Sequence, residues 1–349
     1  MDLCLTNDNE KSEKEIIAHA SKELILLQET GNYIIVRCRK EIKQFLRNGG
    51  HLSIIVCSGE LNTQSLLAFR NNDLHLSADI THRLDGFYDQ IRTLPRHSID
   101  VRYCPYPIDI TSVICPDDGL RSAVVRFAGF KVSYQDKLSF TATAEYTPAL
   151  YRHYIDQIQK YRHSSYKKIL ITGKPHEGKT TLIKHLIQST SITPSMPIYY
   201  MYTEEIIEDG KRTGFNVISS TKPVKRLLAE RNEANRDIPY DVHEDVLDDL
   251  AHEIRSSLNK VLVIDEIGIM QMKSKAFEDA IKEVFDNPYC VLIGTVTEDS
   301  RKCPALEAVK NDLMSELIVY SQNQHDSILK ELTKELNAAL DMYEIKGGF

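Results

Sequence analysis

Paired cysteines are missing from the sequence. It has seven cysteines in 349 residues, an odd number, and no two of them form a C-x-x-C pair. This spacing argues against a zinc site and against a disulfide framework. We interpret these side chains as reduced cysteines that pack as small hydrophobic groups. They are Cys4, Cys38, Cys57, Cys104, Cys115, Cys290 and Cys303.

The sequence also lacks a secretory signal, a membrane span and an excess of positive charge. Its first residues include no basic segment followed by an apolar one, and no apolar run approaches the length of a membrane span. The net charge of −7 argues against broad attraction to nucleic acid or anionic lipid. We therefore expect a cytoplasmic protein without a membrane partner, and nucleic acid is not indicated.

What is present is the composition of an ordinary soluble globular protein, with 42% apolar and 27% charged residues. The length is sufficient for two domains. A polar stretch near residue 164 precedes a sharp change to an apolar strand at Ile169. We expect one α/β domain at residues 1–163 and a second α/β domain, with a mainly parallel sheet, at residues 164–349.

The segment 169–181 carries the strongest motif. Gly173, Gly178, Lys179 and Thr180 occupy every fixed position of the phosphate-binding loop G-x-x-x-x-G-K-[ST]. An apolar strand precedes the loop and an amphipathic helix follows it, which is the context that the motif requires. Because the backbone N–H groups of such a loop and the helix N-terminus bind anions, we predict a P-loop domain that binds a nucleoside triphosphate such as ATP or GTP.

Within this loop, Lys179 is expected to reach the β- and γ-phosphates, and the Thr180 hydroxyl is expected to bind Mg²⁺. The alternative is a glycine-rich turn that matches by chance, which would leave the flanking strand and helix unexplained. The expected nucleotide-binding residues are Gly173, Lys174, Pro175, His176, Glu177, Gly178, Lys179, Thr180 and Thr181.

A second apolar strand, Val261–Ile264, ends in Asp265 and Glu266. At the end of a buried parallel strand, Asp265 would hold the Mg²⁺ shell and Glu266 would orient or deprotonate the attacking water. Such a pair is typical of the additional-strand P-loop class, which includes ATPases of the AAA and RecA type, and it favours hydrolysis over simple binding. Two surface acids at a strand end are the alternative. A third apolar strand, Cys290–Val296, precedes Thr297, either a γ-phosphate sensor or a turn residue.

Other segments of the C-terminal half have clear periodicity. A strand at Ile198–Tyr202 is expected to form a hairpin with Phe215–Ile218, and a helix is expected at Glu244–Leu258. The tail, Gln324–Met342, predicts an amphipathic helix whose apolar face contains Leu329, Leu332, Leu336 and Leu340. We expect this face to pack in the core, with a contact in a homo-oligomer as the alternative.

The N-terminal half predicts a βαβ-like beginning followed by short strands. The last four strands are expected to form hairpins at one side of the sheet. Arg126 lies within an apolar strand, and a half-exposed strand would explain its charge. The expected helices cover residues 13–21, 33–46, 62–70, 80–94 and 148–161, and the expected strands cover residues 24–27, 51–57, 99–103, 112–114, 123–130 and 139–144.

The order of these elements over residues 15–163 resembles the phospholipase-D-like superfamily in a non-catalytic form. Active members need the motif His-x-Lys-x-x-x-x-Asp, and no histidine in this half is followed by lysine two residues later. The corresponding stretch here reads Pro107–Ser112. The resemblance implies a binding or regulatory module whose ligand or protein partner is unknown. An unrelated α/β domain is the alternative.

Collinear motifs over residues 167–335 resemble the thermophile-type nucleoside-triphosphatase family. The resemblance implies a RecA-like core that hydrolyses nucleoside triphosphates with Mg²⁺ and with loose base preference. It assigns catalytic roles to Lys179, Glu266 and Arg212, and metal binding to Thr180 and Asp265, although Arg212 could equally be a solvated hairpin residue. Besides the phosphate loop and the Asp-Glu pair, the motifs are Tyr202–Ile206, Gly210–Phe215, Tyr240–Val242, Ile267–Met270 with Ser274 and Phe277, and Asn323–Asp326.

Three residues depart from that family's pattern. Ile207, Ile269 and Gln271 stand where the family usually has an arginine, a lysine and a glutamate. Fewer charges therefore remain near the expected site. Turnover could be slow, or a charge could come from Lys174, Arg212, the other domain or another subunit, as arginine fingers do.

These features together predict a Mg²⁺-dependent nucleoside triphosphatase that is coupled to, or gated by, its N-terminal domain. Fusions of this kind often belong to bacterial stress or phage-defence systems. A nucleotide-binding switch or scaffold with little turnover is one alternative, and Ile207 and Ile269 favour it. A P-loop kinase is another, although the sequence has no arginine-rich lid.

Overall fold

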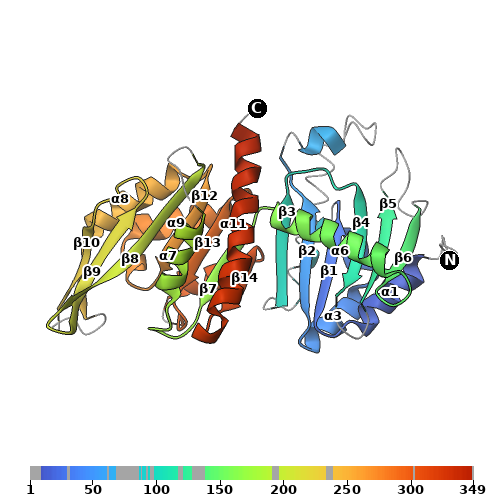
Figure 1. Cartoon of the computed structure of the whole chain (residues 1–349), viewed down its shortest axis with the longest axis horizontal. Coiled ribbons are helices and arrows are strands. Elements are labelled where there is room, and N and C mark those ends of the chain that lie inside the picture. The colour runs from blue at the N-terminus through green and yellow to red at the C-terminus, as the bar shows by residue number, and fades with distance from the viewer. Residues whose placement is uncertain are drawn as a thin grey trace. The chain divides into compact units, whose positions relative to one another are not determined.

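The computed structural model divides the chain into two compact units, residues 1–165 and 166–349. Each unit is an α/β structure with one mixed sheet (Figure 1). The structure describes residues 9–29, 32–60, 63–67, 86–87, 89–91, 93–94, 98–116, 121–127, 138–190, 196–232, 239–301 and 303–347.

The first unit has a six-stranded sheet in the order β3-β2-β1-β4-β5-β6. Strands β1, β2 and β3 are parallel, and β4, β5 and β6 continue the sheet in antiparallel pairs. Helices α1 and α3 pack together, and α6 contacts β6, β5 and β3, so it runs across the sheet (Figure 1). The described elements are α1 (Asn9–His19), β1 (Glu23–Gln28), α2 (Asn32–Arg37), α3 (Arg39–Arg47), β2 (His51–Cys57), β3 (Ile99–Cys104), β4 (Ile110–Cys115), β5 (Ser122–Phe127), β6 (Ser139–Thr143) and α6 (Pro148–His163).

Most of the predicted elements of this unit are confirmed, but the prediction for β3 was wrong in its pairing. We expected β3 to join the hairpins at one side, whereas it pairs in parallel with β2 at the opposite edge. The long connection between β2 and β3, residues 58–98, explains this, because parallel neighbours need a crossover and not a tight turn. Most of the two helices predicted at 62–70 and 80–94 lies outside the described residues.

The interpretation of Arg126 as a half-exposed charge was also wrong. Its side chain is buried, and its Nε donates to Glu13 Oε1 at 2.8 Å. Glu13 lies on α1 and is itself buried, so the ion pair joins this helix to β5 through the protein interior. Breaking one partner of a buried pair leaves an unpaired charge, which makes this contact part of the core of the first unit.

The second unit has an eight-stranded sheet in the order β11-β10-β9-β8-β12-β13-β7-β14. Strands β8, β12, β13, β7 and β14 are parallel, whereas β9, β10 and β11 extend the sheet beyond β8 as antiparallel neighbours. The described elements are β7 (Lys168–Thr172), α7 (Lys179–Ser189), β8 (Ile198–Glu208), β9 (Lys211–Ser219), β10 (Arg226–Arg231), β11 (Tyr240–Val242), α8 (Glu244–Arg255), β12 (Val261–Ile267), the 3-10 turn η3 (Gln271–Lys273), α9 (Lys275–Asp286), β13 (Val291–Val296), α10 (Pro304–Lys310), β14 (Ser315–Val319), η4 (Gln322–Gln324) and α11 (His325–Gly347).

Strand β13 lies between β7 and β12, and it is the additional strand that the Asp-Glu pair predicts. Helices α8 and α9 pack with Leu262 and Ile264 of β12 in one core cluster. Helix α11 packs against α7 (Figure 1). Three of the four predicted leucines of the tail helix, Leu332, Leu336 and Leu340, are buried, which confirms core packing.

Three consecutive residues fix the start of β7. The Tyr166 ring lies 5.6 Å from the Tyr289 ring, and buried Lys167 forms an ion pair with buried Glu335 of α11. The Lys168 Nζ donates to the carbonyl oxygens of Phe285 and Asn287 at the end of α9, at 3.1 Å each. The strand that carries the phosphate loop is thus attached to two helices before the loop begins.

The sequence analysis did not predict five strands and α-helices of the second unit: β10, β11, α9, α10 and β14. Strand β10 reads Arg-Leu-Leu-Ala-Glu-Arg, a composition that favours helix when taken alone. Strand β14 has only five residues and lies at the edge of the sheet. In β10 the pairing with neighbouring strands decides the structure, and local propensity does not.

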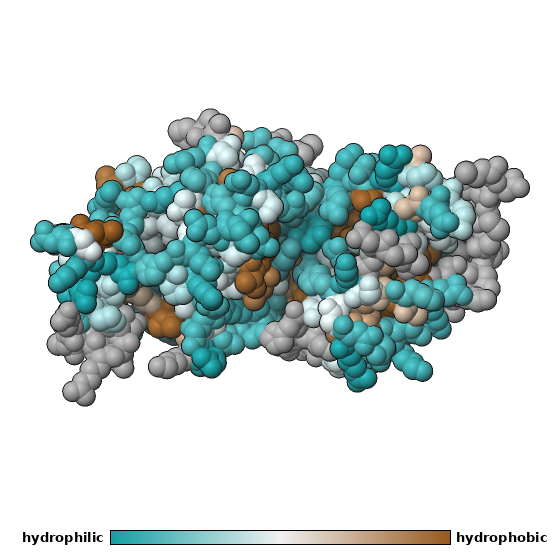
Figure 2. Space-filling view, turned by 60° about the horizontal axis from the view of Figure 1, so that its bottom comes forward, coloured by the Kyte–Doolittle hydropathy of each residue, from teal (hydrophilic) through white to brown (hydrophobic). Residues whose placement is uncertain are grey.

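The surface is mainly hydrophilic on the face shown in Figure 2, with apolar residues in separate patches. No helix in the described part of the chain has both the length and the apolar character needed to cross a membrane. The six cysteines that the structure describes are free, and five of them are buried, as expected for thiols that pack as hydrophobic groups.

Candidate functional site

A pocket of about 780 Å³ lies where the phosphate loop and the carboxyl ends of β12 and β13 meet the β8–β9 hairpin. Its walls combine loop backbone, carboxylates and basic side chains. The lining residues are Gly173, Pro175, His176, Gly178, Lys179, Thr180, Lys184, Thr203, Glu204, Glu205, Arg212, Phe215, Asp265, Glu266, Thr297, Glu298 and Asp299. In open parallel sheets, ligands bind outside the carboxyl ends of the strands.

The phosphate loop has the backbone conformation of an anion-binding loop. His176 and Gly178 have positive φ angles of 67° and 99°, and helix α7 begins directly after Gly178. The Lys179 Nζ donates to the carbonyl oxygens of Gly173 and Lys174, at 2.6 and 2.8 Å. The lysine is therefore folded over the loop, with its ammonium group at the place where a phosphate would bind.

Gly173 is required by close packing as well as by its backbone angle. A Cβ at this position would lie 2.6 Å from the carbonyl oxygen of Tyr320, which follows β14. The Tyr320 N–H in turn donates to the Thr172 carbonyl at 2.7 Å. Tyr320 thus packs against the phosphate loop and leaves no room for a side chain at Gly173, the first glycine of the loop.

Asp265 is buried at the end of β12 and is only half satisfied by protein groups. Its Oδ1 accepts a hydrogen bond from Thr295 Oγ1 at 2.5 Å, whereas its Oδ2 is buried without a hydrogen-bond partner. Burial raises the pKa of Asp265, and the hydroxyls of Thr295 and Thr180 together with the charge of Lys179 offset part of that effect. A buried carboxylate oxygen of this kind, close to a threonine hydroxyl, fits a hard divalent cation.

Glu266 lies beside Asp265 and also lines the pocket. Burial, together with the negative charge of Asp265, raises the pKa of Glu266 to about 7. A carboxyl group with a pKa near neutrality is suited to accept a proton from water. The two adjacent carboxylates therefore differ in environment. Asp265 accepts a hydrogen bond from the Thr295 hydroxyl, and Glu266 lines the pocket.

The opposite wall is the β8–β9 hairpin, where two basic side chains are held by carboxylates. The Arg212 Nη1 donates to Glu205 Oε1 at 2.7 Å, and its Nε donates to the Tyr240 hydroxyl at 2.8 Å. Lys184 of α7 donates to Glu204 Oε1 at 2.6 Å. Both cations line the pocket, and both are engaged by glutamates of the same strand.

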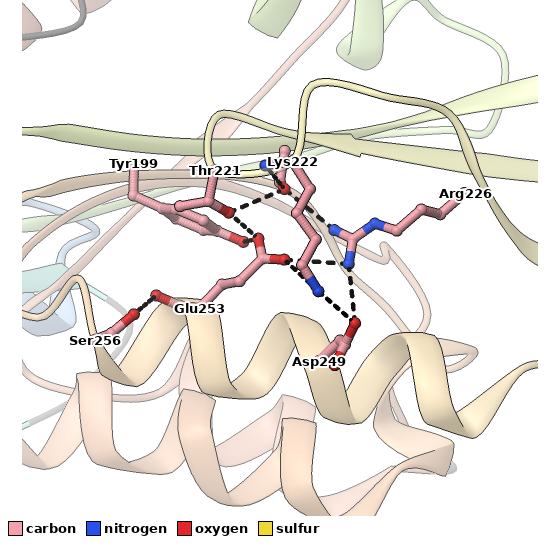
Figure 3. Close-up of polar contacts among 8 residues, drawn as sticks. Tyr199, Thr221, Lys222, Arg226, Asp249, Glu253 and Ser256 are labelled. Carbon is pink, nitrogen blue, oxygen red and sulfur yellow. Dashed lines mark hydrogen bonds and ion pairs between the residues drawn. The ribbon is translucent and has the colours of Figure 1, made fainter.

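A polar cluster around the buried Glu253 anchors the segment that follows the hairpin (Figure 3). Glu253 of α8 accepts hydrogen bonds from Tyr199 and Thr221, and its other oxygen lies 3.1 Å from Arg226 Nη1. Lys222 pairs with Asp249 one turn earlier on α8, at 2.6 Å. The cluster fixes the connection between β9 and β10 to the helix, so the wall that carries Arg212 has firm support.

Comparisons with known proteins agree with this geometry. The family described as NTPase matches residues 168–333. The chain is 33% identical to nucleoside-triphosphatase THEP1 of Thermotoga sp. (strain RQ2) over 179 residues, which cover 95% of that protein and 48% of this chain. The chain belongs to this nucleoside-triphosphatase family. The human cancer-related nucleoside-triphosphatase is 31% identical over 159 residues, covering 83% of its length and 42% of this chain.

Among solved structures, the family is represented by the crystal structure of THEP1 from Aquifex aeolicus. It is 26% identical, with a TM-score of 0.41, and the match covers 98% of that chain and 48% of this one. These matches concern only about half of the present chain. The NTPase family match begins at Lys168 and includes no residue of the first unit.

Most of the residues predicted for the site of this NTPase family member lie together. Lys179, Thr180, Arg212, Asp265 and Glu266 all line the one pocket, as does the strand-end residue Thr297. Three predicted loop residues are not among the lining residues: Lys174, Glu177 and Thr181. Thr181 is exposed, and Lys174 contributes a carbonyl oxygen to Lys179.

Sequence reasoning missed Thr295, Lys184 and Glu204 as members of the site. Thr295 lies in an apolar strand, where threonine is common for its β propensity alone, so no signal distinguished it. Lys184 lies five residues after Lys179, on the helix that the loop begins. Its proximity to a glutamate on a different strand follows only from the sheet order.

Proposed function

We propose that this chain hydrolyses nucleoside triphosphates to the diphosphate and phosphate, with Mg²⁺ as the cofactor. The observation that carries the proposal is the half-satisfied carboxylate of Asp265, which lies beside Glu266 in the same pocket as the phosphate loop. Membership of the nucleoside-triphosphatase family supports the same activity. ATP and GTP are the first substrates to test.

Phosphate binding begins at the loop. Its backbone amides and the start of α7 surround the β-phosphate, and the Lys179 ammonium leaves the carbonyl oxygens of Gly173 and Lys174 for the β- and γ-phosphates. This exchange replaces two hydrogen bonds to neutral carbonyls with contacts to charged oxygens, which are stronger.

Thr180 and Asp265 are the residues that would hold the metal. Thr180 offers its hydroxyl, and Asp265 offers the buried Oδ2, which has no hydrogen-bond partner among the described residues. When bound, Mg²⁺ neutralises negative charge on the phosphate oxygens. Thr295 keeps the other oxygen of Asp265 occupied, so that Oδ2 is the one directed to the cation.

Glu266 is the general base of the reaction that we propose. It takes a proton from water, the water oxygen bonds to the γ-phosphorus, and the bond from that phosphorus to the bridging oxygen of the β-phosphate breaks. The pKa of about 7 allows Glu266 to accept this proton near neutral pH and to release it afterwards. Arg212 and Lys184 line the same pocket, where positive charge stabilises the developing negative charge.

Phosphate release from ATP, GTP, CTP and UTP in the presence of Mg²⁺ tests the proposal on the full chain. We expect turnover in the wild-type protein and none in Lys179→Ala. Glu266→Gln should abolish turnover but retain nucleotide, because it removes the base and keeps the size of the side chain. Nucleotide binding without release from any substrate, and with no effect of Glu266→Gln, would instead establish a nucleotide-binding switch.

We further propose that the first unit is a non-catalytic, phospholipase-D-like binding module that restrains turnover. Support comes from its mixed α/β sheet and from a cavity of about 360 Å³ whose lining includes Tyr106, Asp109 and Lys160. The test is to compare phosphate release by the full chain with release by a chain that begins at Ser164. Faster release by the shorter chain supports restraint, and equal rates oppose it.

A further inference from the structure

The amide of Gln271 is an exception to normal hydrogen bonding within the described residues. Its side chain is fully buried, yet neither its Nε2 nor its Oε1 has a hydrogen-bond partner. Buried amides in folded proteins nearly always have partners, so an unsatisfied one calls for an explanation. Gln271 begins the short 3-10 turn η3, close after the strand that ends in Asp265 and Glu266.

Gly268 shows how close Gln271 lies to the proposed base. A Cβ on residue 268 would lie 2.5 Å from Glu266 Oε1 and 2.8 Å from Gln271 Oε1. The two side-chain oxygens therefore lie near the same point, and the absence of a side chain at Gly268 gives them the space to do so. Glu266 also lines the pocket, so its side chain lies next to both the pocket and the buried Gln271 amide.

The two ends of an amide are nearly the same size and have opposite hydrogen-bonding character. Rotation of the Gln271 amide about its last bond exchanges Oε1 with Nε2 and directs an N–H group to the Glu266 carboxylate. Neither end of the Gln271 amide has a hydrogen-bond partner in the described part of the chain, so this rotation breaks no hydrogen bond.

We propose that Gln271 is a positioning residue that holds the Glu266 carboxylate toward the pocket by donating a hydrogen bond from Nε2. This role rests on the proposed function of Glu266 as the general base. The amide touches neither nucleotide nor metal, and it acts through Glu266. Positioning by a hydrogen-bonded neighbour improves the placement of a catalytic group without altering substrate binding.

Gln271→Met tests this role because methionine has a similar length and volume but no amide. We expect kcat to fall by about tenfold or more, with KM and the affinity for a fluorescent nucleotide analogue unchanged within about twofold. Met272→Leu, in the same turn, is the matched control and should keep the wild-type kcat. Thermal unfolding of both variants shows whether each is folded.

A double-mutant cycle separates positioning from a general loss of structure. Glu266→Asp withdraws the carboxylate from the amide, so adding Gln271→Met to it should lower kcat no further. An equal fall of kcat in both backgrounds, or wild-type kcat in Gln271→Met, would overturn the assignment while leaving hydrolysis itself established. If the wild-type chain releases no phosphate from any nucleotide, the proposed function and this inference both fail.

Discussion

Thr295 Oγ1 lies 2.5 Å from Asp265 Oδ1, across the pair of parallel strands β13 and β12. Both side chains are buried near the carboxyl ends of their strands, and Asp265 also lines the pocket. The hydroxyl occupies one carboxylate oxygen and leaves the other free for a cation. The relationship depends on the insertion of β13 next to β12, which makes the two residues neighbours.

Replacement of Thr295 by valine should weaken metal binding. Valine has the same shape but donates no hydrogen bond, so Asp265 Oδ1 becomes unpaired and the carboxylate loses its orientation. Loss of such a supporting contact lowers metal affinity or activity by about 10- to 100-fold. Phosphate release measured over a range of Mg²⁺ concentrations should show a higher half-saturating concentration. Thr295→Ser, which retains the hydroxyl, should resemble the wild type.

Replacement of Arg212 by alanine decides between its two interpretations. If the guanidinium leaves Glu205 to stabilise charge on the γ-phosphate, kcat should fall by roughly 100-fold, and nucleotide affinity should change much less. Lys211→Ala, the neighbouring exposed cation on the same hairpin, is the control and should have little effect. A loss of activity no larger than that of the control would make Arg212 a structural residue.

We predict that the first unit loses stability in acid because Asp100 becomes protonated. Burial would raise the pKa of this carboxyl, but the hydrogen bond from His51 and the charge of Arg102 lower it to about 2. Since the folded pKa lies below the ordinary value of about 3.9, ionised Asp100 stabilises the folded state above about pH 4. That contribution, of about 2 kcal/mol, is lost as the pH falls from about 4 to about 2.

Asp100→Asn measures this contribution directly. Urea unfolding should show a less stable variant at about pH 6, and the difference from the wild type should shrink as the pH falls below about 4. Ser53, which donates to the same carboxylate at 2.9 Å, can still donate to the asparagine carbonyl. A difference that stays constant between about pH 6 and pH 2 would contradict the assignment.

The contacts at the start of β7 predict where a shortened chain that contains only the second unit should begin. A chain that begins at Ser164 retains Tyr166, Lys167 and Lys168 and should unfold cooperatively. A chain that begins at Ile169 loses all three, and with them the ion pair to Glu335 and the hydrogen bonds to the end of α9, so it should melt at a lower temperature. Circular dichroism during heating compares the two. Equal melting temperatures would show that these residues do not stabilise the unit.

The parts of the site that could be predicted from sequence are those in which local pattern and chemistry coincide. The phosphate loop has fixed residues at fixed spacing, and Asp265 and Glu266 end an apolar strand. From these features we could predict the phosphate loop, the two carboxylates and the additional strand. Thr295 and Lys184 could not be predicted, because a threonine in a strand and a lysine on a helix have ordinary explanations and their partners lie on other elements.

In the fold, too, the elements with a clear local pattern could be predicted and the contacts between distant segments could not. Strands such as β2 and β12 are predictable because each contains an uninterrupted apolar run of four residues, Ile54–Cys57 and Val261–Ile264. The pairing of β3 with β2 is a contact between distant segments, and the local pattern of β3 does not distinguish a hairpin from a crossover. Strand β10 has the composition of a helix, and only its neighbours β9 and β11 make it a strand.

Strand β8 pairs with β12 along its first residues and with β9 along its last ones. Residues 198–202 pair with β12, whereas its outer part, through residue 208, pairs only with β9. Glu204 and Glu205 lie in the outer part, just beyond the row in which Tyr202 pairs with Asp265. The glutamates that hold Lys184 and Arg212 therefore belong to the antiparallel extension of the sheet, whereas Asp265 belongs to its parallel core.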